Sequence, residues 1–357
     1  SPATVRPKAM TGYNAFDEPV AAKNPLGHVY RVAYDRLGRP TVRTGPAYTP
    51  PGGGPAITPT ERTTYDPMGN PTQVIDPRGG VTRYTYDRLD RMTVRDEPGT
   101  GEERALWRYA YTRTGEPLSV TDPTGAETRF TYDDLDRRVT MTQVERRPTT
   151  DNLTTRYRYD DAGDLVSVTS PGGDVTVNTY DSAGNLIRTK DPAGVQESFG
   201  YDAEGRPLRS TDGLGRTKTV SYDALGRMAA ESDLGPDGVT LRTQTYAYDL
   251  DGNLTAATDP YGRKTTYAYD AADRLVEQVE PVSPTESITT GFGYDAAGNR
   301  TRYTDGRGNR TIHTFNGLGL PESVIEPATP AHPDPADRTW TAAYDAGANP
   351  VRLAAPG

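Results

Sequence analysis

The pair Tyr-Asp recurs along this sequence at a nearly fixed spacing. Twelve copies begin at Tyr34, Tyr65, Tyr86, Tyr132, Tyr159, Tyr180, Tyr201, Tyr222, Tyr248, Tyr269, Tyr294 and Tyr344. Two degenerate copies, Tyr111-Thr112 and Phe315-Asn316, fill the gaps, and seven of the thirteen intervals are 21 residues. A fixed period of this length indicates one supersecondary unit that stacks on its neighbours. About fourteen units are expected.

Each unit carries two turn signals. Four residues after the Tyr, ten units have Gly and three have Asp (Asp90, Asp136 and Asp273). These residues tolerate positive φ, so we expect a left-handed position there. The Asp of the pair is expected to accept backbone N–H bonds within the turn that it opens. In the seven short units a second signal follows eleven residues after the Tyr, as in Asp76-Pro77-Arg78-Gly79, which has the residue preferences of a type I turn.

Two turns in 21 residues leave two segments of about six residues, which is strand length. Aromatic residues two positions apart, such as Tyr84 and Tyr86, would lie on the same face of a strand. The return segments, such as Leu165-Val166-Ser167-Val168-Thr169, alternate less cleanly, so we expect a bulge or two half-buried faces there. No segment has helical periodicity. The sequence predicts an all-β chain of antiparallel hairpins in one repetitive sheet.

The long intervals place their extra residues between the return segment and the next Tyr segment. In an antiparallel meander the two kinds of turn lie on opposite edges. All long hairpins are therefore expected on one edge, with uniform Tyr-Asp turns on the other. The longest insertion runs from Thr44 to Thr60, and its Gly52-Gly53-Gly54 run is the best candidate for a flexible segment.

Composition restricts the function. The net charge is -9, and the basic residues are scattered, so nucleic-acid binding has no electrostatic footprint. No apolar run approaches the roughly 20 residues of a membrane span. There is no Cys, which removes disulfides, thiolate nucleophiles and cysteine metal sites. Only 33% of the residues are hydrophobic, but the regular Tyr spacing argues against disorder.

Candidate sites for catalysis are few. The three His residues are His28, His313 and His332; we interpret His313 as a packing residue and His332 as a solvated loop residue. Acidic residues recur with the turns, which favours turn chemistry over a glycosidase pair. Asp249-Leu250-Asp251-Gly252-Asn253 resembles the start of a calcium loop, but the later Glu is missing and the string is a turn of the repeat. We therefore predict no enzyme, and no catalytic, cofactor-binding or metal-binding residue.

These units resemble the Rhs/YD-repeat family of bacterial polymorphic toxins, toxin-complex cocoon subunits and animal teneurins. The resemblance covers about residues 29 to 350 and rests on Tyr-Asp-x-x-Gly-Asn/Arg-Leu followed by Asp-Pro-x-Gly. It implies a continuous sheet that spirals into a solenoid or hollow shell, which in bacterial members surrounds a C-terminal toxin. The family's C-terminal core motif, which closes the shell and in many members cleaves off the toxin, is not visible here. We therefore expect an incomplete shell and, since the sequence starts Ser1-Pro2-Ala3, a fragment or processed piece.

The predicted organisation is a lead-in over residues 1–28 that includes a degenerate repeat at Tyr13, hairpins over 29–350 and a tail over 351–357. The leading functional hypothesis is a wall segment of a secreted or cell-surface bacterial protein that encloses or presents cargo. Its partners would be a toxin cargo, other segments of the same protein, or further copies through the end strands. The alternative is an extracellular adhesive or fibre-forming module that binds glycans or cell surfaces through the long hairpins.

Overall fold

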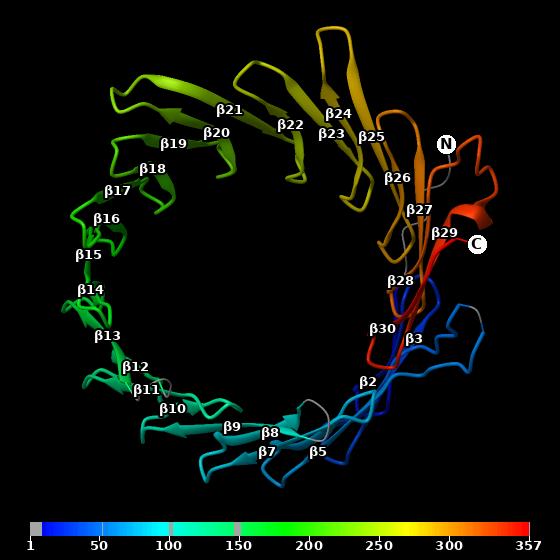
Figure 1. Cartoon of the computed structure of the whole chain (residues 1–357), viewed down its shortest axis with the longest axis horizontal. Coiled ribbons are helices and arrows are strands. Elements are labelled where there is room, and N and C mark those ends of the chain that lie inside the picture. Colours follow the sequence, from blue (N-terminus) through cyan, green and yellow to red (C-terminus); the bar gives the residue numbers. More distant parts are fainter. Residues whose placement is uncertain (1–8, 52, 100–102, 146–150, 357) are drawn as a thin grey trace. The chain divides into compact units, whose positions relative to one another are not determined.

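The computed structural model describes residues 9–51, 53–99, 103–145 and 151–356. These residues form thirty β-strands and one short 3-10 helix, so the predicted all-β class is confirmed. The helix, Pro335–Arg338, has only four residues and lies between the strand that ends at Ile325 and the strand that begins at Thr339. Figure 1 shows the strands as a succession of hairpins in chain order.

The strand bounds follow the repeat. In the first half they are β1 Met10–Tyr13, β2 Pro19–Lys23, β3 Val29–Tyr34, β4 Pro40–Thr44, β5 Thr60–Tyr65, β6 Pro71–Ile75, β7 Val81–Tyr86, β8 Met92–Pro98, β9 Arg104–Tyr111, β10 Pro117–Thr121, β11 Glu127–Tyr132, β12 Arg138–Glu145, β13 Asp151–Tyr159, β14 Leu165–Thr169 and β15 Val175–Tyr180. In the second half they are β16 Leu186–Lys190, β17 Gln196–Tyr201, β18 Pro207–Thr211, β19 Thr217–Tyr222, β20 Met228–Leu234, β21 Thr240–Tyr248, β22 Leu254–Thr258, β23 Lys264–Tyr269, β24 Leu275–Pro281, β25 Ser287–Tyr294, β26 Arg300–Thr304, β27 Arg310–Phe315, β28 Pro321–Ile325, β29 Thr339–Tyr344 and β30 Pro350–Ala354.

The strands belong to one sheet, and each described pairing joins strands that are consecutive in sequence and antiparallel. The register shifts by one residue where a Tyr strand enters its turn, for example between Arg158 and Tyr159. The return strand β14 is half-buried at every position. The bulge and the two half-buried faces expected for the return segments are thus both present.

The Tyr-Asp turns adopt one geometry. In the turn from Asp181, the amide of Gly184 donates to the Asp181 carbonyl at 3.1 Å, and Asp181 N–H donates to the carbonyl of Asn185 at 2.9 Å. This is a type I turn followed by a left-handed residue, which closes a three-residue hairpin loop with a bulge. Asp90, Asp136 and Asp273 have φ of 60°, 57° and 57°, so the predicted left-handed position is confirmed.

The long hairpins all lie on the edge opposite the Tyr-Asp turns. Their extra residues mostly lengthen the strands, as in β12 with 8 residues and β13 with 9. In the insertion after β4, Gly45 N–H bonds the carbonyl of Pro59 at 2.8 Å, and Tyr48 and Ile57 exchange two backbone bonds. This insertion is therefore a hairpin arm; the flexibility expected at its tip stays a prediction, because Gly52 lies outside the described residues.

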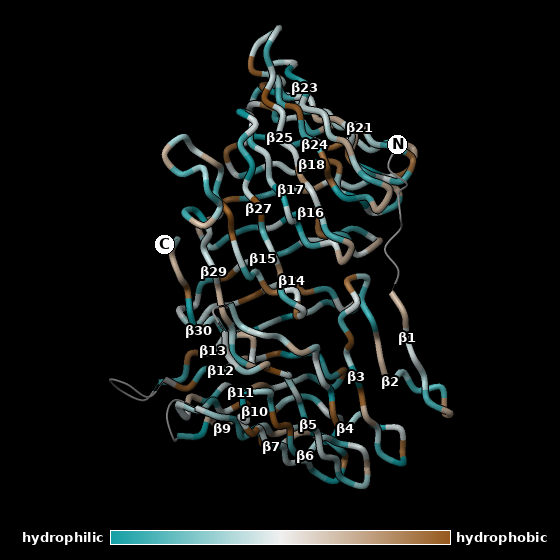
Figure 2. The backbone as a smooth tube through the Cα atoms, turned by 90° about the vertical axis from the view of Figure 1, so that its right-hand side faces the viewer, coloured by the Kyte–Doolittle hydropathy of each residue, from teal (hydrophilic) through white to brown (hydrophobic). Residues whose placement is uncertain are grey.

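The chain divides into two compact units. Unit 1 consists of residues 1–84, 248–255 and 265–357, and unit 2 of residues 85–247 and 256–264. Unit 1 thus holds the first and the last hairpins, which contact each other. The buried hydrophobic side chains among the described residues are Tyr48, Ala256, Ala343 and Tyr344, and of these Tyr48 and Tyr344 meet at that contact. Figure 2 shows polar and apolar residues interleaved along the strands.

The predicted domain bounds meet strands at both ends of the chain. β1 and β2 form a hairpin within residues 1–28, and Asp17, four residues after Tyr13, has a φ of 59° like its counterparts. β30 pairs with β29 and runs into the range predicted as a tail. The division into lead-in, hairpin array and tail stays a prediction about domains.

Candidate functional site

Each Tyr-Asp turn is held by its own aspartate. In the turn after β7, Asp87 Oδ1 accepts hydrogen bonds from the backbone N–H of Leu89 at 2.8 Å and of Arg91 at 3.1 Å. Asp87 Oδ2 accepts from Arg91 Nε at 2.8 Å. The hydrogen bond from Arg91 holds the pKa of Asp87 below its usual range. This confirms the turn role predicted for the Asp and leaves its carboxylate fully occupied.

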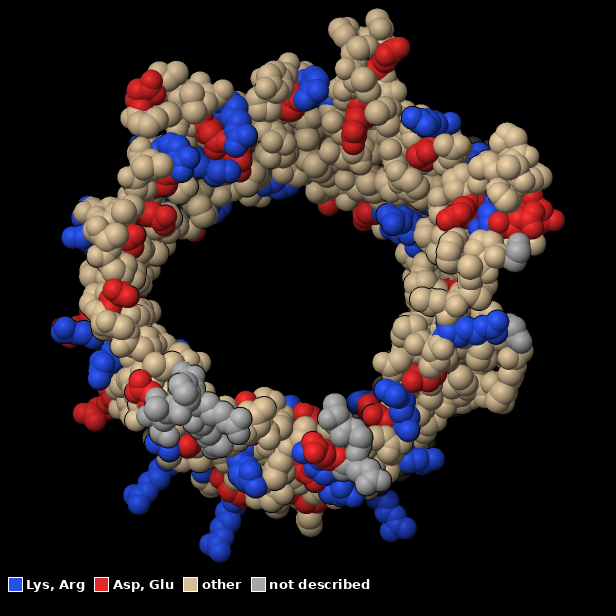
Figure 3. Space-filling model, in the orientation of Figure 1, with Lys and Arg blue, Asp and Glu red and all other residues tan. Residues whose placement is uncertain are grey.

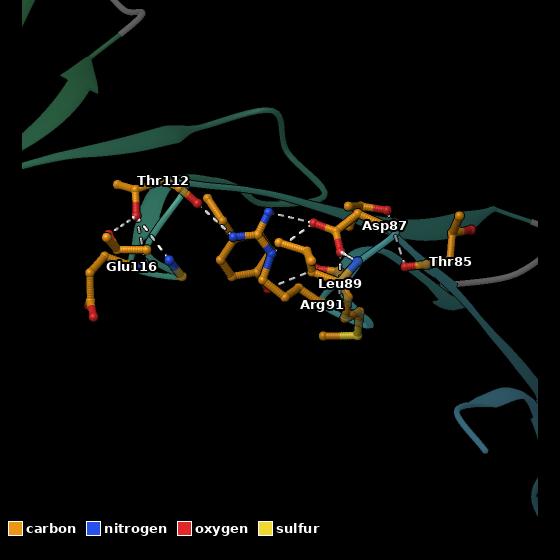
Figure 4. A network of polar contacts seen from close by, with 11 residues as sticks. Thr85, Asp87, Leu89, Arg91, Thr112 and Glu116 are labelled. Atoms are coloured by element: carbon orange, nitrogen blue, oxygen red, sulfur yellow. Dashed lines mark hydrogen bonds and ion pairs between the residues drawn. The ribbon is translucent and has the colours of Figure 1, made fainter. Parts of the chain in front are cut away.

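The arginine of one turn also reaches the next hairpin. Arg91 Nη1 donates to the carbonyl of Thr112 at 2.6 Å, and its guanidinium lies over the ring of Tyr111, 4.9 Å from the centroid. Figure 4 shows this contact from Asp87 through Arg91 to Thr112. Arginine suits the position because its planar guanidinium can bind a carboxylate and stack on a ring together. The same bridge is made by Arg39 to Asp66, Arg137 to Asp160 and Arg274 to Asp295.

The tyrosine hydroxyls form a second link between hairpins. Each donates to the backbone carbonyl of the first residue of the preceding return strand, at 2.7 to 3.1 Å. The described pairs are Tyr34–Pro19, Tyr65–Pro40, Tyr111–Met92, Tyr132–Pro117, Tyr159–Arg138, Tyr180–Leu165, Tyr201–Leu186, Tyr222–Pro207, Tyr269–Leu254, Tyr294–Leu275 and Tyr344–Pro321. We call these hydroxyl links and the arginine bridges the turn-edge network.

The sequence reasoning identified the turn-edge aspartates but missed their partners. The signal was present, because the residue five after each Tyr is often Arg or Asn. Where it is Asn, as at Asn185, the amide donates to the same aspartate oxygen at 3.0 Å. The described side-chain bridges to a backbone carbonyl of the next hairpin come from arginine units, and one asparagine, Asn253, reaches the carboxylate of Asp273 in the next turn at 2.9 Å.

The three histidines lie in separate places. His28 is half-buried and packs on Gly317 in unit 1. His313 is half-buried on β27, where burial and the nearby Arg300 lower its pKa. His332 is exposed, and its backbone N–H bonds Thr329. The packing role of His313 and the loop position of His332 agree with these surroundings.

The calcium-like string is a turn of the repeat. Asp249 Oδ1 accepts from the backbone N–H of Asn253 at 2.8 Å, and Oδ2 accepts from the Asn253 amide at 3.2 Å. The Asn253 amide also reaches Asp273 at 2.9 Å. Within the described ranges, no three His, Asp or Glu side chains are grouped as metal ligands.

A shallow groove of about 430 Å³ lies on unit 2, beside the long hairpin of β20 and β21. Its charged lining residues are already in ion pairs: Arg216 with Asp212 at 2.7 Å, and Asp233 with Lys218 and Arg242. Over the face shown in Figure 3, acidic and basic side chains are interspersed. None of the helical structure among the described residues is long and apolar enough to cross a membrane.

Comparison with known proteins places these features in a family. The Teneurin YD-shell family profile matches residues 134–311, and the RHS Repeat profile matches residues 65–102 and 107–148. No curated protein sequence matches the chain.

Among solved structures, the chain is similar to a TcdB2-TccC3-TEV crystal structure, with a TM-score of 0.77 and 15% identity over 98% of this chain. It is also similar to a Tc holotoxin pore of Photorhabdus luminescens, with a TM-score of 0.52 and 15% identity over 97% of this chain. The match covers 22% and 25% of those two chains, respectively. At this identity the likeness establishes the fold. The repeated Tyr-Asp turns, the antiparallel hairpin sheet and the two profile matches together show that the chain belongs to the Rhs/YD-repeat family.

Proposed function

We propose that this chain is a wall segment of a YD-repeat shell, which encloses or presents a cargo. The observation that carries the proposal is the turn-edge network, which links each hairpin to the next through a repeated set of side chains. A wall requires stabilising contacts between successive hairpins, and it does not require a catalytic or ligand-binding site.

The burial pattern supports a wall. Most strand residues are half-buried or exposed, and no large side chain among the described residues is fully buried. A single sheet of this kind gains stability from neighbour-to-neighbour contacts, as other repeat proteins do. It can therefore extend over many hairpins without a central core, and both of its faces can carry polar side chains.

The proposed partners follow from the family and the structural relatives. The relatives are parts of TcdB2-TccC3 complexes and of a Tc holotoxin pore. By analogy, the partners of this chain are a toxin cargo and other segments of the same larger protein, and its location is outside the cell. In this function the chain itself carries out no catalysis.

The test is protection of a passenger from protease. An unstructured passenger with trypsin sites is fused to the C-terminus of the chain, and the same passenger is fused to an unrelated single-domain protein as the control. Enclosure predicts that the passenger fused to this chain is cut at least about tenfold more slowly than the passenger fused to the control protein, since the cleavage rate follows the exposure of the passenger. Equal cutting would contradict enclosure. Binding on a glycan array, together with equal cutting, would favour the adhesive alternative.

A further inference from the structure

The last two Tyr-Asp turns depart from the repeat. In the first of these turns, Phe315 and Asn316 replace the usual Tyr and Asp, and Gly317 replaces a residue that has a side chain in the other units. In the second, Gly347 and Ala348 occupy the third and fourth positions after Tyr344. Ala348 has a φ of 65°, a conformation that an L-residue adopts at a cost. These departures coincide in space, because both turns are covered by the first hairpins of unit 1.

The covering residues come from the long-hairpin edge of the first strands. His28, before β3, lies over Gly317, and the arm between β4 and β5 places Gly45 beside Leu318. At the equivalent position of an uncovered turn, Leu225 is 70% exposed, whereas Leu318 is half-buried. The long-hairpin edge of the first hairpins thus contacts the Tyr-Asp edge of the last hairpins.

The glycines at this contact leave room for the side chains that cover the turns. Gly317 and Gly347 do not lie in the left-handed region, so the backbone conformation does not require glycine. A Cβ on Gly317 would lie 3.2 Å from Cδ2 of His28, and a Cβ on Gly347 would clash with the side chain of Arg78. Arg78 itself is paired with Asp345 at 3.1 Å. Both turns are therefore shaped to receive the first hairpins.

Tyr48 is the anchor of the contact. Its side chain is 3% exposed, and its ring meets the Tyr344 ring edge-on, with centroids 6.5 Å apart. Burial raises the pKa of the Tyr48 hydroxyl, which faces the backbone of Tyr344 and the amide of Asn316. The hydroxyl has no hydrogen-bond partner among the described residues, so the aromatic ring supplies most of the attraction.

Asn316 stands where most other units have Asp, and its burial explains why an uncharged residue occupies this position. Its Oδ1 accepts from the backbone N–H of Leu318 and of Leu320 at 3.0 Å each, as an Asp would. However, Asn316 is only 5% exposed beneath the arm, and a carboxylate there would be buried without a cation. A neutral amide keeps the turn and avoids the buried charge.

We propose that the turns at residues 315–320 and 344–349 form a peptide-binding site, whose ligand is a Tyr-anchored, extended, Pro/Gly-rich segment. In this chain the occupant is its own arm, whose described residues are 45–51 and 53–59. The site recognises the tyrosine ring against Tyr344 and Asn316, and its two glycines leave room for the side chains of His28 and Arg78, which cover the same two turns. The inference does not depend on the enclosure of a cargo.

The experiment supplies the arm as a separate molecule. In a shortened chain, residues 45–59 are replaced by the chain's own short turn, residues 76–80, and a fluorescently labelled peptide of residues 44–60 is titrated in. We expect the shortened chain to bind the peptide and the intact chain not to, because its own arm is held at high effective concentration. A Tyr48→Ala peptide should bind about tenfold more weakly or worse, and a Tyr48→Phe peptide at least as tightly, since the hydroxyl is unpaired. Asn316→Asp in the shortened chain should weaken binding about tenfold.

Circular dichroism shows whether the shortened chain is folded. The proposal would be overturned if the folded shortened chain did not bind the peptide, or if it bound the Tyr48→Ala peptide equally well. If the shortened chain does not fold, the intact chain gives the answer, because it contains no native Cys. The His28→Cys and Gly317→Cys pair, treated with a short bismaleimide, should crosslink within one molecule. Adding Tyr48→Ala should slow this crosslinking about tenfold, whereas adding Tyr48→Phe should not, and an unchanged rate with Tyr48→Ala would refute the anchor.

Discussion

Replacing Tyr111 by Phe would remove a single hydroxyl from the turn-edge network and leave the ring beneath Arg91 in place. The hydroxyl donates to the carbonyl of Met92 at 2.8 Å and, with the bridge from Arg91 to Thr112, links the hairpin that ends at β8 to the hairpin that begins at β9. A neutral hydrogen bond contributes about 1 kcal/mol, and the half-buried carbonyl left without its donor adds to the loss, so we expect about 1 to 1.5 kcal/mol. That corresponds to a rise of about 5- to 13-fold in the local opening equilibrium.

Hydrogen exchange is the appropriate assay, because a repeat sheet opens locally before it unfolds as a whole. The amides of β8, β9 and β10 should exchange faster in Tyr111→Phe, while those of β17 and β18 in the same unit should not change. Tyr109→Phe is the matched control. Tyr109 lies two residues earlier on β9, is also half-buried, and its hydroxyl makes no hydrogen bond to a described residue.

If Tyr111→Phe and Tyr109→Phe gave the same exchange rates, the hydroxyl links would be coincidental contacts rather than a source of stability. If Tyr111→Phe accelerated exchange throughout unit 2, the sheet would open as one block. That outcome would refute the neighbour-to-neighbour account of the wall.

Three further changes follow from the turns. Ala348→Gly should raise the free energy of unfolding by about 1 kcal/mol in urea titrations, because the φ of 65° is strained for Ala. Gly226→Ala, at a φ of 78°, should lower the free energy of unfolding. A change of the same sign for both variants would contradict the argument. Arg274→Lys should lower the melting temperature, since Lys cannot hold the bidentate contact to Asp270 and reach the next hairpin together. The Arg274 hydrogen bond holds the pKa of Asp270 below its usual range, so this stability is present above the ordinary carboxyl pKa of about 4 and is lost as pH falls below it. A melting temperature that stayed level between pH 5 and the acid range would show that the turn carboxylates contribute nothing.

The local structure of each unit could be predicted because local residues determine it. Asp90, Asp136 and Asp273 occupy the left-handed position that Gly fills elsewhere, and the substitution pattern alone revealed this position. The same holds for the placement of the long hairpins, which follows from where the extra residues fall between two turns. Because the pattern occurs in fourteen copies, each such inference is supported many times, and a departure in a single copy does not hide the pattern.

The contacts between hairpins could be predicted only in part. The Arg at the fifth position after Tyr recurs, but its carbonyl acceptor lies 21 to 27 residues further on, as with Arg91 and Thr112. The contact between the first and last hairpins gave no periodic signal at all. Residues 44–60 contain five Pro and four Gly, and such an insertion is compatible with a loose loop as well as with the docked arm that the structure contains.

Departures from the repeat nevertheless carry information about such contacts, and this can be tested at the second position after the Tyr. Arg occupies that position at Arg36 and Arg88, where the turns are exposed, and Gly occupies it at Gly317, beneath His28. Gly317→Arg should therefore lower the melting temperature by displacing the first hairpins, whereas Ser182→Arg, in an exposed turn of unit 2, should leave it unchanged. If both variants melted alike, glycine at Gly317 would be incidental to the contact. If only Gly317→Arg is destabilising, the irregular copies of a regular repeat identify where its hairpins meet.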